Sequence, residues 1–303
     1  MKVFVTGATG FIGSAIVREL IEAGHEVLGL ARTDAAAASL TAVGAQVHRG
    51  TLVDLDSLGS GAAAADGVIH AAFMTEALAG GPSAFVEAGQ AELRAIEAIG
   101  AVLAGSGRPF VVTSVGPVLG RLLTEEDTRD TSSAAATHVP RNPEVALELS
   151  ARDVRVSVVR LPPSVHGEGD HGFVPVLIGI ARAKGASAYP GDGSNRWPAV
   201  HRLDAAHLFC LALEKAPAGS VLHAVADEGV PVREIAGVIG RHLGVPNVSL
   251  PVEEAGDHFG WIGNFFGSMD YPISSALTRE RLGWHPVQPS LLEDLDQDHY
   301  FKG

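Results

Sequence analysis

Three glycines near the start of the chain have the spacing of a phosphate-binding turn. Gly7, Gly10 and Gly13 recur at every third residue, directly after a short apolar run and at the start of a helical pattern. The first glycine permits a tight turn, the second lets a ligand approach the backbone, and the third lets the helix pack closely on the strand. The N-terminus of such a helix attracts phosphate through its free N–H groups. The motif and its context therefore predict a dinucleotide site.

The residue after the second apolar run discriminates between the two nicotinamide dinucleotides. NAD binders place an acid at this point, where it holds the ribose hydroxyls. Here the run 26–31 is followed by Arg32, whose guanidinium suits a 2′-phosphate and cannot accept a hydroxyl proton. Asp34, two positions later, is the alternative ribose acceptor. Arg32 favours NADP(H) over NAD(H).

Apolar runs alternate with helical segments through the first half of the chain, beginning with a helix over 11–23. Helical crossovers between strands produce a parallel sheet, so the expected fold class is α/β, a Rossmann-type doubly wound parallel sheet. The expected strands cover residues 2–6, 26–31, 46–49, 67–71, 110–113 and 154–160.

The pattern becomes irregular after Pro162 and Pro163, which indicates a change of architecture. We expect residues 1–162 to form an NAD(P)-binding domain, with strands returning to it from about 195–226. Residues 163–303 are expected to form a smaller C-terminal substrate-binding lobe, interleaved with the first domain.

Composition narrows the classes of partner. The 303 residues are 46% hydrophobic and 19% charged, as in soluble globular proteins, and the net charge of -13 with few lysines opposes binding to nucleic acid. The single cysteine, Cys210, excludes an intramolecular disulfide and a metal site built on a cysteine pair. Glycines interrupt the N-terminal apolar stretch before a signal peptide or membrane span forms. We expect a cytoplasmic protein with a small-molecule substrate.

Residues 6–13 (TGATGFIG) resemble the fingerprint of the extended or atypical short-chain dehydrogenase/reductases, which include the NAD-dependent epimerase/dehydratase and 3β-hydroxysteroid dehydrogenase-like proteins. The resemblance covers nearly the whole chain. It continues through GTLVDLDSL at 50–58, VIHAA at 68–72, VTS at 112–114, RLP at 160–162, HG at 166–167 and LGW at 282–284.

This resemblance implies a set of cofactor contacts. Leu52 would lie near adenine, the loop 71–73 on the nicotinamide side, and the turn 162–165 near the carboxamide. With the glycine motif, the implied cofactor-binding residues are Gly7, Thr9, Gly10, Phe11, Ile12, Gly13, Arg32, Leu52, Ala71, Ala72, Phe73, Pro162, Ser164 and Val165. The resemblance also implies a homodimer through helices near residues 90–104 and 140–151.

The family's catalytic pair is missing from this sequence. Its members use a serine and a Tyr-x-x-x-Lys pair, in which lysine lowers the pKa of the tyrosine so that the phenol transfers a proton. None of the three tyrosines has a lysine four positions later. Counting back from Glu144, which resembles a family glutamate, places Ala136 and Pro140 at the tyrosine and lysine positions.

Three residues are candidates for the remaining chemistry: Ser114, His138 and Tyr189. Ser114 follows the fifth strand, although an alternative alignment places Val115 at the serine position. His138 falls where the tyrosine is expected and titrates near neutral pH. His201 and Asp204 lie in a stretch that packs the two lobes together in the family, so a structural role is favoured for both.

Polar and aromatic residues of the second lobe are candidates for substrate binding. His166, Phe173, Arg196 and Trp197 are expected to line the cleft opposite the nicotinamide, where Arg196 would hold an anionic or carbonyl group. Trp261, Phe265 and Phe266 are further apolar candidates. No metal site is expected, because the histidines and acids of 166–173 have no spacing that fixes them on one face.

Three functions fit these residues. The first is an NADP(H)-dependent reductase of a small carbonyl compound, with a substitute proton donor. The second is a catalytically silent NADP(H)-binding sensor or regulatory protein, which the absent pair favours. The third is a nucleotide-sugar epimerase or dehydratase, which the absent pair disfavours most because that chemistry moves protons through defined residues.

Overall fold

The apolar strands of the first half assemble into one parallel sheet. A computed structural model of the chain describes residues 1–74, 81–128, 142–260, 262–263 and 269–302. Within these residues the sheet has the strand order β10-β6-β5-β4-β1-β2-β3, which is the Rossmann arrangement. Its strands are β1 (Lys2–Thr6), β2 (Glu26–Ala31), β3 (Gln46–Arg49), β4 (Gly67–His70), β5 (Pro109–Val115), β6 (Arg155–Leu161) and β10 (Ser220–His223).

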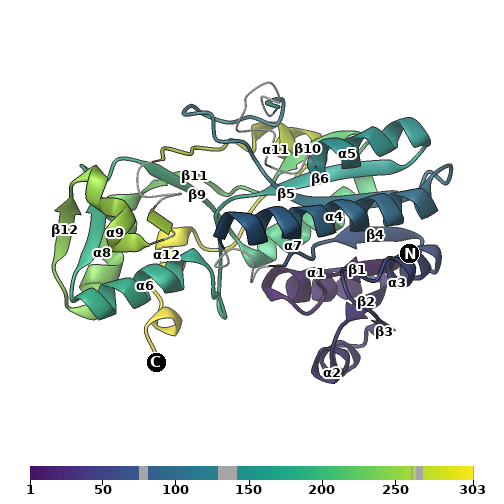
Figure 1. Ribbon diagram of the computed structural model, residues 1–303, viewed down its shortest axis with the longest axis horizontal. Helices are drawn as coiled ribbons and strands as arrows, with labels where there is room; N and C mark the ends of the chain where they lie inside the picture. Colours follow the sequence, from purple (N-terminus) through teal and green to yellow (C-terminus); the bar gives the residue numbers. More distant parts are fainter. Residues whose placement is uncertain (75–80, 129–141, 261, 264–268, 303) are drawn as a thin grey trace.

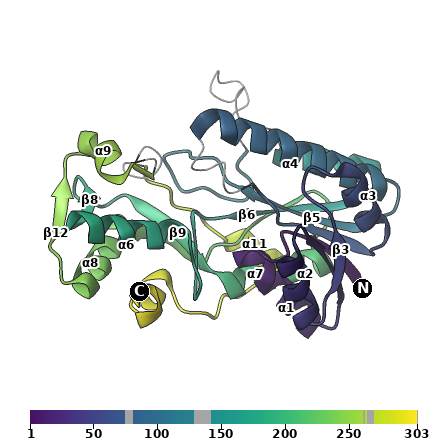
Figure 2. The ribbon, with the colours of Figure 1, turned by 60° about the horizontal axis from the view of Figure 1, so that its bottom comes forward.

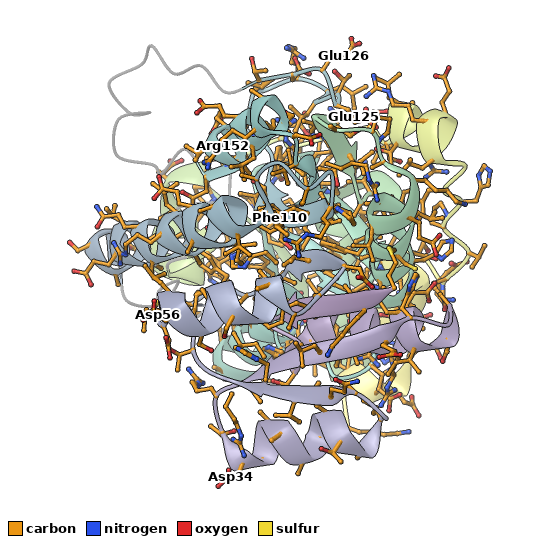
Figure 3. All side chains as sticks on the ribbon, turned by 90° about the vertical axis from the view of Figure 1, so that its right-hand side faces the viewer. Asp34, Asp56, Phe110, Glu125, Glu126 and Arg152 are labelled. Atoms are coloured by element: carbon orange, nitrogen blue, oxygen red, sulfur yellow. The ribbon has the colours of Figure 1, made fainter. Side chains whose placement is uncertain are left out.

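Helices cover both faces of this sheet, which explains why its strands are nearly continuous apolar runs. Val3, Phe4 and Val5 are fully buried, as is Phe110 at the middle of the molecule in Figure 3. Figure 2 shows α3 and α4 on one side of the sheet and α1 and α7 on the other. The first layer consists of α3 (Leu55–Ala63), α4 (Gly81–Leu103), α5 (Asn142–Glu148) and the 3-10 turn Leu149–Arg152, and the second of α1 (Phe11–Glu22), α2 (Asp34–Ala42) and α7 (Arg202–Lys215).

The second half builds a smaller lobe with two small sheets, at the left of Figure 1. One sheet has the order β11-β9-β7 and the other pairs β12 with β8. Its strands are β7 (Ser164–His166), β8 (Ser187–Pro190), β9 (Arg196–His201), β11 (Asp227–Pro231) and β12 (Asn247–Leu250). Its helices are α6 (Phe173–Lys184), α8 (Val232–Leu243), α9 (Ala255–Phe259) and α12 (Leu291–Leu295), with 3-10 turns at Val252–Glu254 and Asp298–Tyr300.

The chain passes between the two lobes more than once. In the segment 195–226, β9 joins the small three-stranded sheet. Helix α7 then packs on the large sheet, and β10 forms one edge of that sheet. A later helix, α11 (Ala276–Leu282), lies beside α7 and β10. Helix α7 therefore links the two lobes: it packs in the core of the Rossmann domain and also contacts β7 and β9 of the smaller lobe.

The expected fold class is confirmed, and the strand limits differ by a few residues. Strands β1, β2 and β3 have the predicted bounds. Strand β4 ends one residue earlier, at His70, while β5 extends over 109–115. In the described part of the chain, no helix combines the length and the apolar character that crossing a membrane requires.

Candidate functional site

The glycine motif forms a turn with no room for side chains. Gly7 has a φ of +70°, and a Cβ added there would lie 2.7 Å from the Ala71 carbonyl. A Cβ on Gly13 would lie 1.9 Å from the Gly7 carbonyl oxygen. Thr9 and Gly10 are exposed, and helix α1 begins directly after them at Phe11, with Ile12 in its first turn. The first N–H groups of α1 therefore face an open turn that would accept a pyrophosphate.

Two buried side chains fix the ends of β1 and β4 behind this turn. The Thr6 hydroxyl lies 2.9 Å from Nδ1 of His70, and the Ala72 N–H donates to the same hydroxyl at 3.4 Å. Burial lowers the pKa of His70 to about 4, so the imidazole is neutral near pH 7. This contact anchors the loop of Ala71, Ala72 and Phe73, whose half-buried side chains follow β4.

Two arginines stand at the ends of neighbouring strands, on the side expected for adenosine. Arg32 follows β2 and is exposed. Arg49 ends β3, opposite Ala31 in the register of the sheet, and its Nη2 lies 2.6 Å from the Asp34 carboxylate. Asp34, labelled in Figure 3, is the first residue of α2. Arg49 is a candidate that sequence reasoning missed, because strand pairing alone brings it beside Arg32. Leu52 is half-buried and lies three residues after Arg49, in the loop that follows β3.

The turn after β6 is mostly enclosed. Pro162 and Ser164 are buried and Val165 is partly buried against the large core. The Ser164 hydroxyl has no hydrogen-bond partner among the described residues. This buried hydroxyl is the polar group of the turn that a carboxamide would satisfy.

Ser114 lies at the carboxyl end of β5, next to Arg160 of β6. Its side chain is half-buried, and its hydroxyl donates to the Val115 carbonyl at 3.2 Å. Two apolar residues that follow Ser114 along the chain are open to solvent, since Val115 is 61% and Val118 is 44% exposed. A hydroxyl beside exposed apolar groups suits a carbonyl compound with apolar substituents.

Tyr271 supports the loop that follows Ser114, a contact that sequence reasoning missed. Its hydroxyl donates to the Gly116 carbonyl at 2.6 Å. Burial raises the pKa of this phenol well above its usual value, so Tyr271 remains protonated and holds the loop. The Leu123 N–H donates to the Pro272 carbonyl at 2.9 Å, which fixes the same two segments. The two residues are far apart in sequence, and no local spacing signals the contact.

The other two catalytic candidates have different positions. His138 lies outside the described residues, as do Ala136 and Pro140. Tyr189 lies on β8, opposite Ser249 of β12, and packs against the core of the small lobe. Its strand belongs to the two-stranded sheet, so it is not part of the edge that carries Ser114.

The candidate substrate-binding residues are either more buried than expected or already paired with another side chain. His166 is fully buried, and its Nδ1 lies 2.9 Å from the Asp294 carboxylate. Trp197 is 2% exposed and packs edge-on against the half-buried Phe173. Arg196 is exposed but pairs with Asp270 through two hydrogen bonds of 2.9 and 2.7 Å. His166 and Trp197 thus belong to the interior of the small lobe rather than to an open cleft, since each is covered by its lobe's own side chains. Trp261, Phe265 and Phe266 lie outside the described residues.

His201 and Asp204 make structural contacts at the lobe boundary. The His201 side chain caps α7 by accepting from the Leu203 N–H at 3.3 Å. The Asp204 carboxylate accepts from the backbone N–H groups of Val287 and Gln288 at 2.9 and 3.0 Å. His201 thus caps the start of α7, and Asp204 attaches that helix to residues 287–288.

The loop 166–172 extends from the small lobe to the glycine motif. The His171 ring meets the Phe11 ring edge-on, with centroids 5.7 Å apart. The Arg202 guanidinium lies 5.2 Å from the centre of the same ring. Phe11 thus connects the start of α1 with the loop of the small lobe. The same contacts place two basic side chains, His171 and Arg202, near the position expected for the pyrophosphate.

Comparison with known proteins agrees with this geometry. The family model described as NAD dependent epimerase/dehydratase family matches residues 3–224. The chain belongs to this family. Members of this family bind NAD(P), and the turn fits that group, because Gly7 and Gly13 allow a close backbone packing that leaves the N-terminus of α1 next to the exposed Thr9 and Gly10.

Several relatives cover nearly the whole chain. An uncharacterized protein of Schizosaccharomyces pombe is 52% identical, covering 99% of this chain and 100% of its own length. The 2-alkyl-3-oxoalkanoate reductase of Stenotrophomonas maltophilia is 30% identical, covering 83% of this chain and 78% of its own. The solved UDP-glucose 4-epimerase of Thermotoga maritima has a TM-score of 0.75 at 19% identity, covering 99% and 98% of the two chains. A reductase is therefore among the sequence relatives, and the epimerase shares the fold.

Proposed function

We propose that the protein catalyses the NADPH-dependent reduction of a carbonyl compound with apolar substituents. The observation that carries the cofactor preference is the pair Arg32 and Arg49 at the ends of β2 and β3. Two guanidinium groups suit the 2′-phosphate that distinguishes NADPH from NADH. Asp34, the alternative ribose acceptor, is already paired with Arg49.

The apolar edge around Ser114 supports the substrate class. Val115, Val118 and Leu122 follow Ser114 along the chain and are exposed, which favours a ketone or aldehyde with hydrocarbon groups over a nucleotide sugar. The name of the Stenotrophomonas maltophilia relative, a 2-alkyl-3-oxoalkanoate reductase, agrees with this class.

The chain's residues would position the substrate and supply the proton. Reduced nicotinamide, when bound, supplies hydride to the carbonyl carbon. The Ser114 hydroxyl donates to the carbonyl oxygen and holds it, while the apolar residues exclude water from its other side. The proton that completes the alcohol comes from water or from a substitute donor, for which His138 is the candidate, because Tyr189 lies on a different sheet from Ser114.

The test measures binding and turnover separately. Purified protein is titrated with NADPH and NADH, and NADPH oxidation is then followed with a panel of ketones, aldehydes and enones. We expect tighter binding of NADPH, and Arg32→Ala and Arg49→Gln should each weaken NADPH binding about tenfold while changing NADH binding little. Arg152→Gln, at an exposed arginine remote from both strands' ends, is the control. Preference for NADH would contradict the cofactor assignment.

One observation favours a second function. Because the Tyr-x-x-x-Lys pair is absent, the protein could bind NADP(H) without turnover, as a sensor of the cofactor's redox state. Binding of NADPH without oxidation by any carbonyl compound would support this function. An epimerase or dehydratase receives no support from Ser114 and its apolar neighbours.

A further inference from the structure

Three potential metal ligands converge at the edge of the sheet opposite the glycine motif. His25 immediately precedes β2, so it lies at the amino ends of the strands. Cys210 and Glu214 are four positions apart on α7 and therefore share one face of that helix. The ligand atoms of the three residues all lie within 4.8 Å of one another, and Nε2 of His25 lies 3.0 Å from Oε1 of Glu214. Helices α1 and α7 pack together here, as Figure 2 shows.

We propose that His25, Cys210 and Glu214 form a binding site for Zn²⁺. Thiolate, imidazole and carboxylate are the three ligand types that zinc uses in proteins. Zinc holds them at about 2.0–2.3 Å, so small side-chain movements would bring atoms at these separations around one ion. A fourth position is available to water, because the Glu214 side chain is 32% exposed while Cys210 is buried.

The orientation of the histidine ring suits the site. The Met1 amino nitrogen lies 3.4 Å from Nδ1 of His25, which leaves Nε2 directed toward Glu214 and Cys210.

The site would act on structure rather than on hydride transfer. Helix α7 begins with Arg202, which lies over Phe11 at the cofactor edge, and ends with Lys215 at the opposite edge. An ion held by Cys210, Glu214 and His25 would clamp the far end of α7 to the turn between α1 and β2. Zinc binding should therefore stabilise the Rossmann domain without being required for NADPH binding.

The same two helices provide a matched control. His207 of α7 lies 2.7 Å from the carboxylate of Glu19 of α1, so a second histidine and carboxylate stand close by outside the three-residue cluster. Substitution of His207 therefore tests whether any neighbouring histidine of these two helices, or His25 in particular, binds the ion.

The experiment is a titration of chelator-treated full-length protein with Co²⁺, followed by displacement with Zn²⁺. We expect one equivalent of Co²⁺ with a thiolate-to-cobalt charge-transfer band, and its loss on addition of Zn²⁺. Cys210→Ala and His25→Gln should abolish the band, and His207→Gln should keep it. Thermal unfolding should shift upward with Zn²⁺ in the wild type and in His207→Gln, but not in Cys210→Ala.

The outcomes are distinguishable from failure to fold. If Cys210→Ala does not fold, Glu214→Gln, at the more exposed ligand, tests the same site and should weaken Co²⁺ binding at least tenfold. Absence of the thiolate band in the wild type would overturn the proposal. So would binding that survives Cys210→Ala, or that His207→Gln removes equally.

Discussion

The Arg49 guanidinium lies 2.6 Å from the Asp34 carboxylate, beside the exposed Arg32 at the end of β2. Both partners of the pair are exposed, so the contact is screened by solvent and readily rearranged. Asp34 therefore occupies the guanidinium that a 2′-phosphate would need. It also places a negative charge close to where that phosphate would bind.

Asp34→Asn should raise the affinity for NADPH about threefold and leave that for NADH nearly unchanged, because it removes like-charge repulsion and releases Arg49. The gain should shrink as salt concentration rises. Titration with both cofactors at low and high salt measures the effect. Glu126→Gln, at an exposed acid on the opposite side of the molecule from Asp34 in Figure 3, should change neither affinity. Weaker NADH binding by Asp34→Asn would instead identify Asp34 as the ribose acceptor.

The local part of the fold could be predicted from the sequence. Strands β1, β2 and β3 are short apolar runs between turns, and their limits depend on neighbouring residues alone. The glycine motif can also be predicted from the sequence. The turn over residues 7–13 requires a positive φ at Gly7 and a close approach of Gly13 to Gly7, and both requirements are local. Local information is therefore sufficient to predict the glycine turn and the start of α1.

The catalytic and substrate-facing half depends on contacts between distant segments. Tyr271 reaches Gly116 across 155 positions, and His166 meets Asp294 across 128. A histidine just before a glycine-rich loop resembles a ligand contact, but His166 ends β7, and the local sequence does not determine which way its side chain turns. The burial of His166 follows from α12, whose position the sequence pattern does not specify.

Ser114→Ala should lower kcat for carbonyl reduction roughly 10²-fold, because it removes the hydroxyl that would hold the carbonyl oxygen. NADPH affinity should remain unchanged, since the cofactor contacts lie on other strands. Steady-state kinetics and cofactor titration separate the two effects. Ser114→Thr retains a hydroxyl and should keep most of the activity. Full activity of Ser114→Ala would remove the serine from the mechanism and favour the alignment with Val115.

Gly13→Ala should lower stability by about 1–3 kcal/mol, because the added methyl group overlaps the Gly7 carbonyl oxygen and the turn must move. The same movement should weaken NADPH binding. Gly179→Ala, in the exposed part of α6, is the matched control, since no atom lies within 4 Å of its added Cβ. That control should gain about 0.5–1 kcal/mol from helix propensity. Denaturant unfolding and cofactor titration check both variants, and equal behaviour would contradict the assigned role of the turn.

Glu92 on α4 gives a pH dependence of stability. Burial raises the pKa of its carboxyl to about 7, partly opposed by the hydrogen bond that the Asn142 amide donates at 2.6 Å. The folded state thus holds the proton more tightly than the unfolded state, whose carboxyl has a pKa of 4.5. The stability associated with the protonated carboxyl is fully present below pH 4.5 and is lost as the pH rises through 7.

Glu92→Gln should therefore raise the free energy of unfolding at pH 8 by roughly 3 kcal/mol and remove the decline between pH 4.5 and 7. The glutamine oxygen can still accept from Asn142, so the variant keeps the hydrogen bond while eliminating the titration. Urea unfolding across this pH range measures the change. Glu97→Gln, at an exposed glutamate of the same helix, should leave the pH profile as in the wild type. A decline that persists in Glu92→Gln would assign the pH dependence to another group.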